Sequence, residues 1–186
     1  MQNRLWQLLA ILALALMTVG CNRQVVYAHY EHVEDTGWEK CDTLHFDIPP
    51  IAKGGTYAEK AALRIDKEFP FQSLTLRIIQ TVYPEGRQEN YTLNCSLIDP
   101  KGNVKGDGIS YFQYSFHLDD IVLQQGDSLH LSIVHNMKRE TMPGVTDVGI
   151  RLTRKKQGQE PSSTTHQVTT SIDAQEDEQQ QRESPE

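Results

Sequence analysis

The stretch Asn90-Tyr91-Thr92-Leu93-Asn94-Cys95-Ser96-Leu97 decides the fold class, because it alternates without a break between two kinds of side chain. Tyr91, Leu93, Cys95 and Leu97 occupy every second position, and polar residues fill the positions between them. A period of two places successive side chains on opposite faces of a β-strand, so one face is buried and the other is solvated. We therefore predict a half-buried strand over residues 90–97.

The same alternation recurs along the chain on both sides of this stretch. Further strands are predicted over residues 43–48, 57–66, 74–82, 112–118, 129–134 and 148–152. Pro49-Pro50 ends the first of them, and the start of the 57–66 segment could also form a helical turn on propensity alone. No amphipathic helix of useful length lies between the strands. This pattern predicts an all-β, antiparallel β-sandwich of about seven or eight strands, either jelly-roll or immunoglobulin-like.

A cluster of turn residues follows the opening strand at Asp99-Pro100-Lys101-Gly102-Asn103. The acidic residues of this segment do not have the order of a calcium loop, and a closing Glu is missing. We expect a hairpin connection between the strands at 90–97 and 112–118.

The chain begins with the features of a bacterial export signal. Arg4 precedes an unbroken apolar run over residues 8–17, which is too short to span a bilayer, and small or compact residues lead to Cys21. The arrangement looks like the lipobox of bacterial lipoproteins, in which the new amino-terminal Cys carries acyl chains. An ordinary signal peptide that happens to precede a cysteine is the alternative. We predict lipidation at Cys21 and a membrane anchor made of acyl chains.

Composition divides the chain into distinct parts. We predict a signal peptide at 1–20, a membrane tether at 21–37, a β-sandwich domain at 38–156 and a disordered acidic tail at 157–186. The tail holds most of the formal net charge of −7, because its own net charge is −6, whereas residues 21–156 carry only −2. The folded part therefore lacks the basic surface that nucleic-acid binding requires.

Two cysteines remain once Cys21 is assigned to lipid. Cys41 and Cys95 would lie in a compartment that permits disulfides, so the two could form a bridge. The alternative is that both are small buried apolar residues. The sequence leaves this choice open, because it does not give the distance between their Cα atoms.

No familiar catalytic, nucleotide-binding or metal-binding motif occurs, and we expect neither enzyme activity nor a cofactor. The carboxylate pairs Asp119-Asp120 and Glu31 with Glu34 are interpreted as solvated charges. His29 and His32 lack further residues to complete a metal site. His117 and His130 are expected on the solvent side, where they could be cross-strand neighbours.

Several motifs resemble those of the GldH family of gliding-motility lipoproteins from the Bacteroidota. They are Trp38-Glu39-Lys40-Cys41-Asp42 leading to Phe46, Phe69-Pro70-Phe71, Asp99-Pro100-Lys101-Gly102, and His135-Asn136-Met137-Lys138-Arg139 leading into residues 144–151. The resemblance covers residues 21–156 almost from end to end. It implies a non-enzymatic envelope lipoprotein, associated with gliding motility and type IX secretion and with protein partners in that machinery.

The resemblance also suggests where the chain is located and how it is modified. Surface display in this phylum tends to need acidic residues after the lipidated Cys, whereas Asn22-Arg23-Gln24 follow here, so we predict the periplasmic side and favour the outer membrane over the inner. Asp42-Thr43-Leu44 and Asp127-Ser128-Leu129 fit the O-glycosylation pattern of the phylum, at Thr43 and Ser128, although both could be ordinary strand starts. A glycan-binding or glycan-hydrolysing sandwich is the alternative function.

Overall fold

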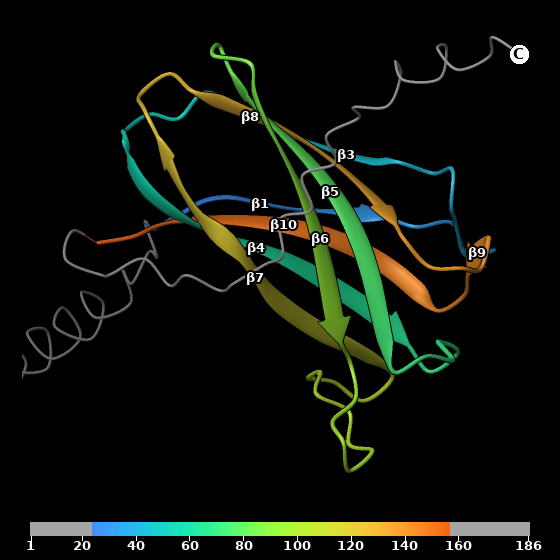
Figure 1. The fold of residues 1–186 in the computed structure, drawn as a ribbon. Helices are drawn as coiled ribbons and strands as arrows, with labels where there is room; N and C mark the ends of the chain where they lie inside the picture. Colours follow the sequence, from blue (N-terminus) through green and yellow to red (C-terminus); the bar gives the residue numbers. More distant parts are fainter. Residues whose placement is uncertain (1–23, 157–186) are drawn as a thin grey trace, which may run out of the picture.

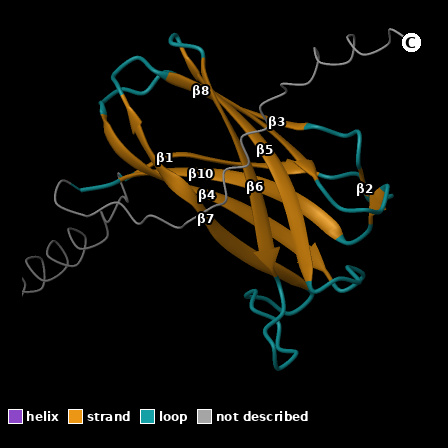
Figure 2. Ribbon diagram, in the orientation of Figure 1, coloured by secondary structure: helices purple, strands orange, loops and turns teal. Residues whose placement is uncertain are grey.

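The computed structural model describes residues 24–156 (Figure 1), a range that excludes Cys21, the predicted signal peptide and the predicted tail. The strands are β1 (Val25–His32), β2 (Trp38–Glu39), β3 (Leu44–Ile48), β4 (Gly55–Asp66), β5 (Ser73–Tyr83), β6 (Arg87–Ser96), β7 (Tyr111–Leu123), β8 (Ser128–His135), β9 (Thr141–Met142) and β10 (Val145–Arg154). Each of the seven segments predicted from alternation lies within or largely overlaps one of these strands. Within the described range, Figure 2 shows strands and loops and no helix, so no helix there could cross a membrane.

Two antiparallel four-stranded sheets face each other across the core (Figure 1). The first sheet has the order β1-β10-β4-β7 and the second sheet has the order β3-β8-β5-β6, while β2 and β9 form a short separate pair. Between the long strands, only the connection from β5 to β6 stays within one sheet. This arrangement is a jelly roll, which confirms the sandwich and excludes the immunoglobulin-like alternative.

One continuous apolar core fills the space between the sheets. The inward positions of the long strands supply most of it, and Trp38 from the short pair is also completely buried. The alternation that predicted each strand therefore marks the faces that meet: Leu93 and Cys95 of β6 point inward, and Asn94 and Ser96 point to solvent. Burial of these side chains is the main favourable contribution to folding.

Two predictions about chain organisation are corrected. Residues 25–32, which the sequence placed in the tether, form edge strand β1 and pair with β10 over most of its length, so the sandwich begins at Val25 and not at residue 38. The Asp99 segment is not a hairpin connection, because β6 pairs with β5 in the second sheet whereas β7 pairs with β4 in the first. This segment crosses between the sheets at one end of the molecule.

Candidate functional site

Four polar side chains form a hydrogen-bonded array on the outer face of the second sheet. Strand pairing places Asp47 opposite His130 and His45 opposite Ser132 on β3 and β8. His130 Nδ1 donates to Asp47 Oδ1 over 2.7 Å, and His130 Nε2 lies 3.3 Å from Ser132 Oγ. His45 Nδ1 lies 3.1 Å from the same oxygen, and the two imidazole rings stack with centroids 5.3 Å apart.

The order Asp47, His130, Ser132 is that of a serine-hydrolase triad, but its surroundings do not support acyl transfer. Such a reaction needs backbone or side-chain donors directed at the developing oxyanion. Ser132 lies inside β8, whose backbone is paired with β3 on one side and β5 on the other, so the nearby N–H groups are already used. The Asp47 side chain is also 85% exposed. The array is therefore a hydrogen-bonded network on the outer face of the sheet, without the features that acyl transfer needs.

A hollow of about 560 Å³ adjoins the array, where β3 and β5 end and β8 begins. Its lining residues are Asp47, Ile48, Pro49, Pro50, Tyr83, Ser128, Leu129 and His130. The sequence identified Pro49-Pro50 only as a strand terminator and gave no sign that Tyr83 would join them. Because these residues come from three segments far apart in the chain, only the sheet pairing brings them together.

The predicted neighbours His117 and His130 are far apart in the topology, because β7 and β8 belong to different sheets. His117 lies 3.6 Å from Asp120 instead, and the Asp120 side chain is only 3% exposed. Asp120 also forms an ion pair with Lys155. The interpretation of Asp119-Asp120 as a solvated pair is therefore correct for Asp119 and wrong for Asp120.

The other predicted pairs are not brought together into a site. His29 lies 2.9 Å from Glu31, and His32 lies 3.5 Å from Asp147, because residues three apart on a strand point to opposite faces. Glu34 is exposed in the turn after β1. Among residues 24–156, no group of three or more His, Cys, Asp and Glu side chains could hold a metal ion.

Both described cysteines are free thiols, so the structure does not form the bridge between Cys41 and Cys95. Cys41 is exposed just before β3, at one edge of the second sheet, whereas Cys95 is buried on β6 at the opposite edge. Three strand spacings of about 4.8 Å each separate these edges, beyond the reach of a disulfide. The alternative of two buried thiols is correct for Cys95 only, and burial raises its pKa to about 12.

The two predicted glycosylation residues have different surroundings. Thr43 is exposed in the turn before β3, whereas Ser128 is half-buried at the start of β8 and lines the hollow. Modification of Thr43 and Ser128 remains a prediction. Lipidation of Cys21 also remains one, because this residue lies outside the described range.

A buried acid that the sequence analysis missed lies between the sheets. Glu59 sits on the inner face of β4, at a bulge in the pairing with β7, and is only 1% exposed. Burial, with a smaller contribution from the charge of Glu89, raises its pKa to about 8. Glu59 Oε1 and both side-chain amide atoms of Gln80 on β5 are buried without hydrogen-bond partners. The interruption of the apolar pattern of β4 by Glu59 was the available signal.

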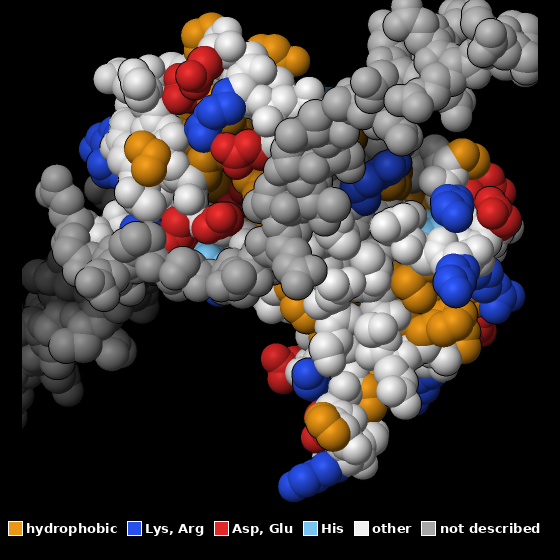
Figure 3. All heavy atoms as spheres, viewed as in Figure 1, with side chains coloured by type: hydrophobic (Ala, Val, Ile, Leu, Met, Phe, Trp, Pro, Cys, Tyr) orange, Lys and Arg blue, Asp and Glu red, His pale blue; other side chains and the backbone are white. Residues whose placement is uncertain are grey.

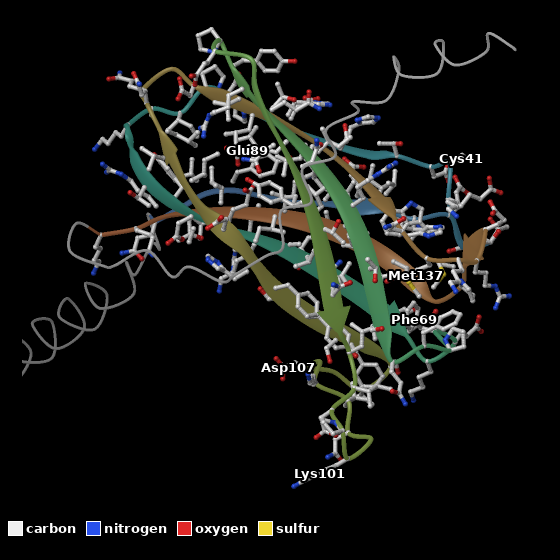
Figure 4. The ribbon with its side chains drawn as sticks, in the orientation of Figure 1. Cys41, Phe69, Glu89, Lys101, Asp107 and Met137 are labelled. Carbon is white, nitrogen blue, oxygen red and sulfur yellow. The ribbon has the colours of Figure 1, made fainter. Side chains whose placement is uncertain are left out.

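Three of the four motifs that carried the family resemblance, all except Asp99-Pro100-Lys101-Gly102, meet at the end of the sandwich where β2 pairs with β9. Trp38 pairs with Met142 and packs edge-on against His135, with ring centroids 5.4 Å apart. Figure 4 shows Met137 and Phe69 at the same end, and Thr75 N donates to the Met137 sulfur over 3.4 Å. Burial lowers the pKa of His135. These three motifs therefore pack together and define this end of the fold.

Gly144 shows how closely the motif segments pack at this end. It has a φ of +78°, and a Cβ atom there would lie 2.4 Å from the backbone nitrogen of Phe69. Only glycine combines this conformation with such a close approach. The backbone at Gly144 can therefore pack directly against the Phe69-Pro70-Phe71 corner only because residue 144 is glycine.

Several solved structures are similar to the chain in part, with low scores. They include a family GH115 4-O-methyl-α-glucuronidase (TM-score 0.41, 14% identity, 73% of this chain and 18% of that one). A family 35 carbohydrate-binding module from Clostridium thermocellum has a TM-score of 0.33 at 13% identity, covering 70% of this chain and 90% of the module. Latent PorU from Porphyromonas gingivalis has a TM-score of 0.31 at 7% identity, covering 70% and 13%. Scores this low carry no functional argument.

Sequence comparison gives a clearer result. The chain is 26% identical over 152 residues to the gliding motility lipoprotein GldH of Flavobacterium johnsoniae, covering 78% of this chain and 94% of that protein. The family model described as GldH lipoprotein matches residues 25–152, from the first residue of β1 into β10. The match thus includes every strand of the jelly roll, β10 up to Leu152, and the chain belongs to the GldH lipoprotein family of the cell envelope.

Proposed function

We propose that this chain is a non-enzymatic interaction component of the gliding-motility and type IX secretion machinery, anchored by lipid on the periplasmic side of the envelope. The observation that carries the proposal is the extent of the family match, which covers residues 25–152 and so nearly all of the folded domain. The outer membrane is favoured over the inner as the site of the anchor. Partners are other envelope proteins, and nucleic acid is not among them.

The chemistry of the described side chains supports a role without catalysis. The one array with the order of a catalytic triad lacks free backbone donors beside Ser132. Buried Glu59 has no described basic partner with which to share a proton. Basic and acidic side chains are interspersed over the uncovered surface in Figure 3, so no extended surface of one sign marks a charged substrate on this face.

The crossover between β6 and β7 is the surface that we assign to partner contact. It contains Val104 and Ile109 and leads into Tyr111, three of the large apolar residues that are exposed in the described range. Ile109 is 86% exposed. Figure 4 shows that the part of this segment with Lys101 and Asp107 projects beyond the strands. Exposed apolar residues grouped in a projecting loop are typical of protein contact sites.

A deletion strain complemented with defined variants tests this role. The wild-type gene should restore export of type IX cargo proteins, and Ile109→Asp should fail to do so at an equal protein level. Val122→Asp is the matched control, because Val122 is also exposed, at 67%, but lies on β7 away from the crossover. Unchanged export in the deletion strain, with loss of polysaccharide breakdown, would favour the glycan-directed alternative.

The proposed anchor is tested separately by Cys21→Ala. This variant should leave the membrane fraction and lose incorporation of radiolabelled palmitate, because two or more acyl chains are needed for stable attachment. A variant that still partitions wholly with membranes would show that lipid at Cys21 is not the anchor.

A further inference from the structure

The hollow beside the polar array combines apolar faces with a fixed polar edge. Tyr83 is 49% exposed as a residue, and Pro49 and Pro50 are exposed beside the same hollow. Aromatic rings and proline rings offer flat surfaces to the C–H groups of a ligand. Such a combination, with few polar groups in fixed positions, is typical of small-ligand sites.

The polar edge is held in place by the array behind it. Asp47 Oδ1 accepts from His130 Nδ1, and His130 is itself bound on its other side to Ser132. The carboxylate is thereby oriented, while most of the Asp47 side chain remains open to solvent and can accept hydrogen bonds from a ligand. The Ser128 hydroxyl adds a group that can donate or accept.

The ionisable residues that line the hollow indicate which class of ligand it can bind. Asp47 and His130 are the acid and the base among the residues that line the hollow, and neither Lys nor Arg is one of them. A phosphate or carboxylate group would approach the Asp47 carboxylate without a fixed positive charge to balance it. A neutral ligand with hydroxyl donors and an apolar face fits better.

We propose that this hollow binds one hexose unit of a neutral glycan. One face of the pyranose ring packs on Tyr83 and the two prolines, and neighbouring hydroxyl groups donate to the Asp47 carboxylate. The volume of about 560 Å³ lies within the usual range for small-ligand sites. The site lies on the second sheet and does not involve the crossover assigned to protein contact, so either proposal can fail without the other.

Saturation-transfer difference NMR on the full chain, kept in phosphocholine micelles that carry no sugar, tests the site. The probes are the neutral trisaccharides maltotriose, cellotriose, mannotriose and triacetylchitotriose, and an octaproline peptide represents a competing class of ligand. We expect saturation transfer to ring protons of at least one sugar. Tyr83→Ala should weaken that binding about tenfold, and Asp47→Asn should also weaken it.

Controls separate a local effect from loss of structure. Tyr111→Ala removes an aromatic ring that is 58% exposed but lies on β7, and it should bind the sugar as the wild type does. Tyr83→Trp keeps a stacking surface and should retain binding. No transfer to any of the four sugars, transfer to octaproline alone, or sugar binding that survives Tyr83→Ala unchanged would overturn the proposal.

Discussion

Replacement of Glu59 by Gln should make the free energy of unfolding, relative to that of wild type, increase as the pH rises. Glu59 is fully enclosed between the sheets, and its pKa is raised from 4.5 to about 8, mainly by burial. At pH 7 the folded protein keeps this carboxyl protonated, whereas the unfolded chain ionises it. Folding must therefore take up a proton, and this uptake costs free energy.

The magnitude follows from the difference between the two pKa values. Each unit corresponds to about 1.4 kcal/mol, so two and a half units between 4.5 and pH 7 correspond to roughly 3 kcal/mol. Because the folded pKa is the higher one, the cost is absent below pH 4.5, rises with pH, and levels off above about 8. A glutamine side chain cannot ionise, so Glu59→Gln lacks this cost at every pH.

Urea unfolding at pH 5, 6, 7 and 8 measures the effect, with the emission of Trp38 as the signal. Trp38 is buried, and the other tryptophan, Trp6, lies in the predicted signal peptide. The stability of Glu59→Gln relative to wild type should increase by roughly 2 to 3 kcal/mol between pH 5 and pH 7. An unpaired amide can lower the absolute stability of the variant, so the change with pH is the test.

The exposed Glu34 supplies the control, since Glu34→Gln should show no such trend. A difference between wild type and Glu59→Gln that stays constant from pH 5 to pH 8 would refute the reasoning. It would mean that Glu59 is ionised, or equally solvated, in both states.

Two further predictions concern burial at other positions. A maleimide should label Cys41 in the native protein and Cys95 only after denaturation, because Cys95 is buried and its pKa is about 12; labelling of neither thiol until a reductant is added would instead indicate a bridge. Asp120→Ala should cost about 3 kcal/mol in urea unfolding, because it leaves the largely buried Lys155 amine without this carboxylate. Asp119→Ala, at an exposed position, should cost less than about 1 kcal/mol, and equal losses for the two variants would contradict the role of the ion pair.

The sequence predicted which face of each strand is buried, but it did not predict which strands pair with one another. Period-two alternation located seven strands and their buried sides, since burial acts on each residue separately. It missed β1, because most residues of this edge strand are exposed or only partly buried and Tyr27 is its one apolar residue packed on the core. It also misjudged the Asp99 segment, because turn residues stop a strand but do not determine which sheet the next strand joins.

The sequence by itself determined the fold class and the family, since both follow from local patterns. The signal peptide at 1–20 remains a prediction from the sequence. Tertiary structure alone decided the jelly-roll order, the meeting of His45, Asp47, His130 and Ser132, the hollow beside Tyr83, and the burial of Glu59. The physical reason is that strand register depends on packing between residues far apart in the chain. A local sequence pattern does not specify the strand with which a given strand pairs. A shift of β3 by one residue against β8 would send His45 and Asp47 to the opposite face, away from His130 and Ser132.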